Sequence, residues 1–222
     1  MNVQKSIVIF NIHGGIGDIL YAYNPIKKVI KKENINVITT FNGSKINNEF
    51  IKSLFHDDIF DKLTFINKHY DDHILRNLIN EHKHLEIKYI NYHPETKDDY
   101  LRYLTMPNFQ DKIRFKINMD YSKKLYEKLI TQIGNKYILI HERDKDNCNR
   151  DMLPINRKYF TKELPVYNFD FYSKENYGIK SDLIFDYYHI ITNAEEIHGY
   201  NGSLMCFIDR IEHIFKNVYL HA

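Results

Sequence analysis

The sequence predicts an α/β protein built from two βαβ domains, each with a parallel sheet covered by helices. Short β-branched apolar runs alternate with longer segments of helical apolar spacing, which is typical of parallel sheets with helical crossovers. This series stops in the irregular stretch 93–119, which contains Pro94 and Pro107, and resumes near residue 120. We therefore expect one domain at 1–118 and a second, shortened one at 119–222.

The first half should contain four strands and three helices. The nearly continuous apolar run 6–12 is typical of a strand buried on both faces. Apolar residues at helical spacing predict a helix over 18–32, which Pro25 should kink or restart. The other expected elements are strands 35–41, 62–66 and 85–92 and helices 44–55 and 71–83, with Ser44 as an N-cap.

The second half repeats this pattern. A helix over 120–134 should end at Gly134, because glycine readily adopts the left-handed conformation that closes helices. The other expected elements are strands 136–142, 165–171, 195–200 and 217–222 and helices 181–194 and 202–215.

The composition of the chain argues against several classes of protein. The chain of 222 residues is 43% hydrophobic and 27% charged, as in ordinary globular proteins, and its formal charge of +2 does not suggest nucleic-acid binding. We expect no secretory signal and no transmembrane segment, which leaves open a peripheral membrane contact. Only Cys148 and Cys206 are present, so a reducing cytoplasm is the simplest location.

The segment "HGGIGD" joins the first strand to the first helix. Its glycines Gly14, Gly15 and Gly17, next to His13, suit either a sharp structural turn or a loop that approaches a ligand closely. It has neither the G-x-G-x-x-G spacing of dinucleotide sites nor the lysine of a phosphate-binding loop. Asp18 either stabilises the helix N-terminus or acts as a proton-accepting carboxylate at the carboxyl edge of the sheet.

Two segments of the second half also place polar groups after strands. His141 and Arg143 follow the strand at 136–142, where arginine suits a diphosphate but a solvated turn is equally expected. After the strand at 195–200, Asn201 or Ser203 serves either as an N-cap or, with Gly202, as part of a pyrophosphate site.

The sequence offers candidates for a nucleotide pocket but none for a metal site. His141, Tyr172, Ser173 and His198 are candidates for lining a nucleotide pocket, although an ordinary loop also explains Tyr172 and Ser173. The histidines and cysteines lack the spacing of known zinc motifs, so we expect no metal site.

The segments "GGIGDILYAYNPIKKV" (14–29) and "NAEEIHGYNGSLMCFIDRI" (193–211) resemble parts of a known family. They are similar to GT-B glycosyltransferases of the ADP-heptose:lipopolysaccharide heptosyltransferase type, and to short bacterial and viral glycosyltransferase-like proteins. The resemblance implies two Rossmann-like domains facing a cleft, with a glycan or glycolipid acceptor on the first domain and a nucleotide-sugar donor on the second. It also implies metal-independent, inverting transfer without a cofactor.

The resemblance further implies roles for single residues. Asp18 matches the proposed general base, beside the glycine loop, while Ser203 with Asn201 and Gly202 matches the donor-pyrophosphate segment. Arg143 in "HERDKD" is similar to a diphosphate-binding arginine of GDP-fucose-using relatives.

The chain also departs from the family pattern. Its second half is shorter than usual, and "NGS" stands where relatives carry paired serines or Asp-Thr-Gly. A non-catalytic nucleotide- or glycan-binding module is therefore the main alternative, and a phosphosugar isomerase or epimerase is a third hypothesis.

Overall fold

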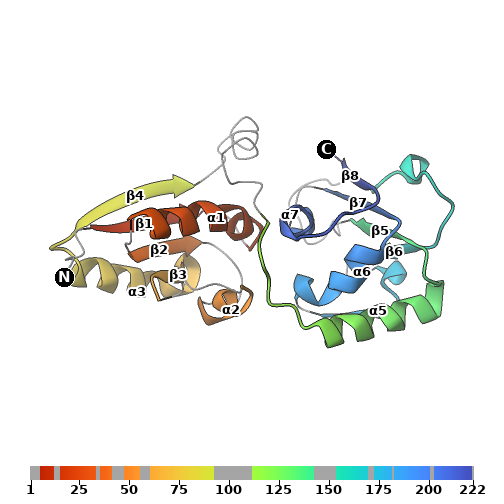
Figure 1. Ribbon diagram of the computed structural model, residues 1–222, viewed down its shortest axis with the longest axis horizontal. Coiled ribbons are helices and arrows are strands. Elements are labelled where there is room, and N and C mark those ends of the chain that lie inside the picture. The colour runs from red at the N-terminus through yellow and green to blue at the C-terminus, as the bar shows by residue number, and fades with distance from the viewer. Residues whose placement is uncertain are drawn as a thin grey trace. The chain divides into compact units, whose positions relative to one another are not determined.

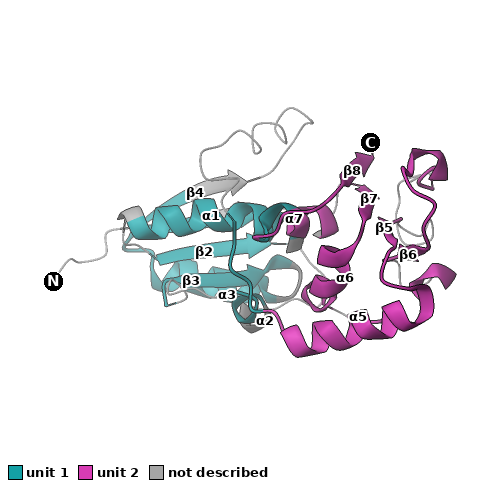
Figure 2. Ribbon diagram, turned by 45° about the vertical axis from the view of Figure 1, so that its right-hand side comes forward, with its two compact units in different colours: residues 1–116, 209–211 teal, residues 117–208, 212–222 magenta. Residues whose placement is uncertain are grey.

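The computed structural model describes residues 6–12, 16–33, 36–41, 48–55, 61–92, 112–142, 154–169, 173–181, 183–200 and 203–221. The chain divides into two compact units, coloured teal and magenta in Figure 2. Unit 1 comprises Met1–Lys116 and Asp209–Ile211, and unit 2 comprises Ile117–Ile208 and Glu212–Ala222.

Unit 1 contains a parallel four-stranded sheet in the order β3-β2-β1-β4 (Figure 1). Its strands are β1 (Ser6–Ile12), β2 (Asn36–Phe41), β3 (Leu63–Asn67) and β4 (Glu86–Tyr92). Consecutive residues of β1, from Ile7 to Ile9, are all buried, as expected for a strand covered on both faces.

The helices of unit 1 are α1 (Ile16–Glu33), α2 (Asn48–Ser53) and α3 (Lys68–Glu81). α1 continues through Pro25, and its buried residues Ile19, Tyr23, Ile26 and Ile30 follow helical spacing. α3 packs apolar side chains such as Leu75 and Leu78 against the sheet. The expected N-cap Ser44 lies outside the described residues.

Residues 209–211 belong to unit 1 because they contact its last segment. The Ile113 N–H donates a 2.8 Å hydrogen bond to the Arg210 carbonyl, and the Lys112 ammonium donates to the Asp209 carbonyl at 2.7 Å. The buried Arg210 guanidinium lies 5.0 Å from the centre of the Tyr21 ring, within cation–π range.

Unit 2 contains a second parallel sheet, in the order β6-β5-β7-β8. Its strands are β5 (Ile138–His141), β6 (Val166–Asn168), β7 (Glu196–Tyr200) and β8 (Val218–His221). One face of this sheet packs Ile138 and Ile140 against Ile155, Phe160 and Leu164. That segment includes the short 3₁₀ helix η2 (Arg157–Tyr159). The predicted α/β class with parallel sheets is therefore confirmed.

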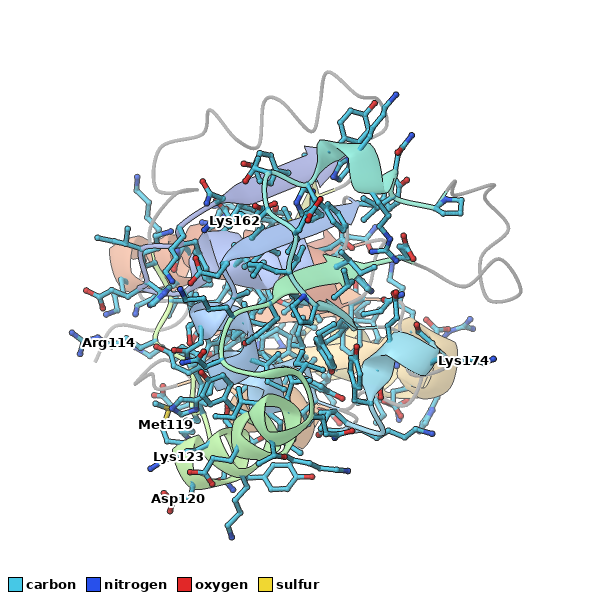
Figure 3. The ribbon with its side chains drawn as sticks, turned by 90° about the vertical axis from the view of Figure 1, so that its right-hand side faces the viewer. Arg114, Met119, Asp120, Lys123, Lys162 and Lys174 are labelled. Carbon is cyan, nitrogen blue, oxygen red and sulfur yellow. The ribbon has the colours of Figure 1, made fainter. Side chains whose placement is uncertain are left out.

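The longest helix of unit 2 is α5 (Met119–Ile133). The Asn118 side chain caps it by accepting a 3.1 Å hydrogen bond from the Tyr121 N–H, and Gly134 follows it at φ +83°. The first residues of α5 are exposed, including Met119, Asp120 and Lys123, which are labelled in Figure 3.

Two helices of unit 2 are shorter than the sequence predicts. The segment expected to be helical over 181–194 forms a 3₁₀ helix, η4 (Ile184–Tyr187), followed by α6 (Tyr188–Asn193). The Ser181 N–H donates to the Tyr187 hydroxyl at 2.6 Å, and this local contact replaces the expected first turn.

The helix expected over 202–215 is α7 (Ser203–Arg210). The Arg210 carbonyl accepts from Ile113 instead of from the residue four positions later, so the helical ladder stops there. Ile214, which lies beyond the end of α7, is 94% exposed.

Candidate functional site

In each sheet, strands are first added on one side of the first strand, and a later strand is then added on its other side. In unit 1 the chain runs from β1 to β2 and β3, and then returns to place β4 on the other side of β1. In unit 2 it runs from β5 to β6 and then places β7 on the other side of β5. Open α/β sheets bind ligands outside the carboxyl ends of the strands where the strand order changes side in this way. Functional groups are therefore expected at these two edges.

Asp18 lies in the first turn of α1, the helix that follows β1. Its side chain is partly buried, and Gly17 is already part of the helix. A carboxylate in a first turn interacts favourably with the helix dipole, so this position alone is compatible with both predicted roles. The rest of the predicted glycine loop, His13, Gly14 and Gly15, lies outside the described residues.

A polar cluster at the same edge of unit 1 was missed by sequence reasoning. Asn11 is next to last in β1 and pairs in register with Thr40 of β2. Its side-chain oxygen accepts a 2.9 Å hydrogen bond from the Thr40 hydroxyl and another from the Lys68 ammonium at the start of α3. Asn67, the last residue of β3 and the residue before Lys68, is also buried.

Burial lowers the pKa of the Lys68 ammonium, and the nearby Asp72 carboxylate opposes this shift. A partly desolvated cation held by an amide oxygen suits the binding of an anionic or hydroxyl-rich ligand. The available signal in the sequence was a polar residue at the end of each of three strands that should lie side by side.

At the edge of unit 2, His141 ends β5 and pairs in register with Gly199 of β7. Its ring meets the Phe169 ring edge-on, with centroids 5.3 Å apart. A β-carbon on Gly199 would lie 3.2 Å from the Met205 sulfur of α7 and 3.7 Å from the His141 β-carbon. Glycine thus permits close packing of α7 and β5 against β7.

Glu142, the next residue, connects the segment that follows β5 with the last residue of β6. Its carboxylate accepts a 2.8 Å hydrogen bond from the Ile155 N–H and a 3.3 Å bond from the Asn168 amide. One Arg157 nitrogen lies 3.9 Å from it. Burial, together with the Glu142 carboxylate, raises the pKa of Tyr200, so this phenol remains a hydrogen-bond donor near neutral pH.

The other predicted residues of unit 2 are only partly described. Ser173 caps the 3₁₀ helix η3 (Lys174–Asn176), where its hydroxyl accepts a 3.2 Å hydrogen bond from the Glu175 N–H. α7 begins at Ser203, whose side chain is not described. The remaining candidates lie outside the described residues: Arg143, Tyr172, Asn201 and Gly202.

His198 belongs to a buried hydrogen-bonded chain. Its ring nitrogens lie 3.1 Å from a Glu196 carboxylate oxygen and 3.0 Å from the His221 ring nitrogen Nε2. The Glu196 and His198 side chains are fully buried, whereas His221 is partly exposed.

Within the described part of the chain, no group of three or more histidine, cysteine, aspartate or glutamate side chains has an arrangement that could hold a metal ion. In the same ranges no helix combines the length and apolar character needed to cross a bilayer.

Comparison of the sequence with protein-family models finds no matching model, and comparisons with curated proteins and with solved structures find no match either. Functional inference therefore depends on the geometry of the two sheet edges.

Proposed function

We propose that the chain is a glycosyltransferase with two Rossmann-like domains, 1–118 and 119–222, in a GT-B arrangement. It would move a sugar from a nucleotide-sugar to a hydroxyl of a glycan or glycolipid. The observation that carries the proposal is the position of Asp18, in the first turn of the helix that follows the first strand of a parallel sheet. In such folds this edge of the sheet is where substrates bind.

In this proposal Asp18 accepts the proton of the acceptor hydroxyl while that oxygen forms a bond to the anomeric carbon of the donor. The bond between the anomeric carbon and the diphosphate oxygen breaks, and the nucleoside diphosphate leaves with the electron pair. Attack from the opposite side gives inversion at the anomeric carbon.

The departing diphosphate requires positive groups on the donor side. Arg143 and the segment Asn201–Ser203 are proposed for this role. The start of α7 at Ser203, three positions after the last residue of β7, supports it, because N–H groups at a helix N-terminus bind phosphate oxygens. The polar cluster of Asn11, Thr40 and Lys68 is proposed to contact acceptor hydroxyls in unit 1.

A thermal-shift screen tests the donor part of the proposal. The full chain is heated with UDP-, GDP-, ADP- and CMP-linked sugars and with the free nucleotides. A ligand present at 100 times its Kd should stabilise the folded state by about 2.7 kcal/mol. Binding of one nucleotide class without any sugar transfer would favour the non-catalytic module, and no stabilisation by any nucleotide would refute both hypotheses.

A further inference from the structure

Three residues at the end of α7 complete unit 1. The helix starts at Ser203, in unit 2, but Asp209–Ile211 belong to unit 1. The Ile113 N–H donates to the Arg210 carbonyl at 2.8 Å, and the Lys112 ammonium donates to the Asp209 carbonyl at 2.7 Å. The side chains of Arg210 and Ile211 are buried. We refer to Asp209–Ile211 as the docked segment.

The docked segment changes how often the chain passes between the units. The chain passes from one unit to the other at 116/117, 208/209 and 211/212. If the docked segment left unit 1, only the first of these connections would remain. Its docking therefore decides whether the two units are joined by three chain connections or by one.

The part of unit 1 that receives this segment is held by contacts of its own. The Lys116 N–H donates a 2.7 Å hydrogen bond to the carbonyl of Leu54, the residue that follows α2. Phe55 and Phe115 form an antiparallel bridge, and their ring centroids lie 5.5 Å apart. None of these four residues belongs to the docked segment. The receiving part should therefore keep its place when the docked segment leaves.

The docked segment buries a charge, and this limits how firmly it is held. The Arg210 guanidinium is fully buried and lies 5.0 Å from the centre of the Tyr21 ring of α1. Its Nε lies 3.7 Å from the carboxylate of Asp209. Removing a guanidinium from water costs free energy that offsets much of the attraction to such neighbours. Docking is therefore stabilised by a small difference between large opposing effects, as expected for a contact that opens while the rest of the fold persists.

The Arg210 carbonyl can accept a hydrogen bond from either of two N–H groups. It accepts from Ile113 in this structure, whereas a continued α7 would bring the N–H of Ile214 to it. Residues 211–214 contain neither glycine nor proline, and Ile214 is 94% exposed, so a helix here would sacrifice little packing of that side chain.

The apolar pattern of α7 also continues past its last residue. Four buried residues follow helical spacing: Leu204, Phe207, Ile208 and Ile211. The sequence therefore favours a longer helix than the one that the docked segment permits. The two arrangements compete for one carbonyl, which is the property of an element with two states.

A permanently docked segment is the simplest alternative. Such a segment would open only when unit 1 unfolds as a whole. Two observations favour a reversible contact instead. The buried guanidinium weakens docking, since an apolar side chain would be buried at lower cost. The Arg210 carbonyl would also regain a hydrogen bond on release, within its own helix.

We propose that Asp209–Ile211 is a reversible latch, which either docks on Lys112 and Ile113 of unit 1 or leaves unit 1 as part of a longer α7. Docking keeps three chain connections between the units and release leaves one, so the latch sets how freely the units move. Docking also holds α1, because Tyr21 lies in that helix, three residues after Asp18. The latch does not depend on sugar transfer or on any ligand.

Native-state hydrogen exchange of the full chain tests the latch, because single amides report on it. The Ile113 N–H is bonded to the docked segment, whereas the Lys116 N–H is bonded to Leu54. The protection factor of Ile113 should be at least about tenfold below those of Lys116 and the β1 amides, and at least about tenfold above that of an unstructured amide. Equal protection of Ile113 and β1 would mean that the segment opens only with unit 1, and an unprotected Ile113 would mean that it does not dock. Either result would overturn the proposal.

A variant in the docked segment tests whether the latch opens separately. Ile211→Ala removes a buried side chain, so the protection of Ile113 should fall at least about tenfold while that of Lys116 is unchanged. Ile74→Ala, at an exposed isoleucine of α3, is the control and should leave both amides unchanged. Unchanged protection of Ile113 in Ile211→Ala, or an equal loss at Ile113 and Lys116, would overturn the proposal.

A matched pair of variants at Ile214 tests the longer helix of the released state. Because Ile214 is 94% exposed, Ile214→Ala and Ile214→Gly lose nearly the same contacts in the docked state. Glycine is less favourable than alanine in a helix by about fivefold in equilibrium constant. Release should therefore be harder in Ile214→Gly, and Ile113 should be about fivefold better protected than in Ile214→Ala. Equal protection in the two variants would rule out a helical released state.

Discussion

The hydrogen bond between Lys68 and Asn11, at the carboxyl edge of the unit 1 sheet, allows the stability of a Lys68 variant to be predicted. The Lys68 ammonium and the Thr40 hydroxyl share one acceptor, the side-chain oxygen of Asn11. A hydrogen bond to a charged group contributes about 1.5–3 kcal/mol to stability. Burial of the ammonium costs free energy and so offsets part of this contribution, and it also lowers the pKa of Lys68. Lys68→Met keeps most of the apolar stem and leaves Asn11 bonded to Thr40. We therefore expect this variant to lose about 1 kcal/mol or less.

A double-mutant cycle isolates the hydrogen bond from the cost of burial. Urea unfolding of Lys68→Met, Asn11→Ala and the double variant should give a coupling energy of about 1.5 kcal/mol, larger than the loss in Lys68→Met alone. Lys83→Met, at an exposed lysine after α3, is the control and should change stability by less than about 0.5 kcal/mol. A coupling energy below about 0.3 kcal/mol would mean that Lys68 and Asn11 do not interact, and would contradict the hydrogen bond between them.

The lowered pKa of Lys68 also sets the direction of a pH effect. The folded state releases the Lys68 proton at a lower pH than the unfolded state, whose pKa is close to 10.5. The free energy of unfolding of the wild type, relative to Lys68→Met, should therefore rise as pH increases through the folded-state pKa toward 10.5.

Two further variants test unit 2. Glu142→Ala leaves the N–H of the buried Ile155 without its carboxylate acceptor, so urea unfolding should show a loss of about 1–3 kcal/mol, and unchanged stability would contradict the bridging role. Hydrogen bonds from Lys162 and Lys216 lower the pKa of Glu195 to about 2, so this carboxylate stabilises the fold above pH 4.5 and loses that effect as pH falls toward 2. Glu195→Gln should therefore be less stable than wild type at pH 7 and equal to it near pH 2, whereas Glu163→Gln, at an exposed glutamate, should follow the wild type throughout.

Local patterns in the sequence predict most of the strands and helices. The run 6–12 and the helix that follows it appear at or near the expected limits, because each is specified by its own periodicity and the glycines between them. The end of α7 was not predictable in this way. It depends on Ile113, about a hundred residues away, whose N–H occupies the Arg210 carbonyl.

The residues of the candidate site likewise include some that the local sequence predicts and others that it does not. Asp18 could be proposed because it follows a glycine turn directly in sequence. The cluster of Asn11, Thr40 and Lys68 depends on the register of three strands, and the contact of His198 with His221 depends on the pairing of β7 with β8. Single-sequence periodicity predicts which face a residue occupies but not which residue of another strand it meets.

The measurement that tests the central claim most directly is sugar transfer by Asp18→Asn compared with Asp120→Asn. Both residues are aspartates in the first turn of a helix, so removal of either charge should cost a similar 0.3–1 kcal/mol or so through the helix dipole. Release of nucleoside diphosphate in the presence of a glycan acceptor is followed for each variant. If Asp18 is the general base, Asp18→Asn should lose about 10²–10⁴-fold in turnover with donor affinity unchanged, while Asp120→Asn remains active. Equal turnover in the two variants would contradict the account.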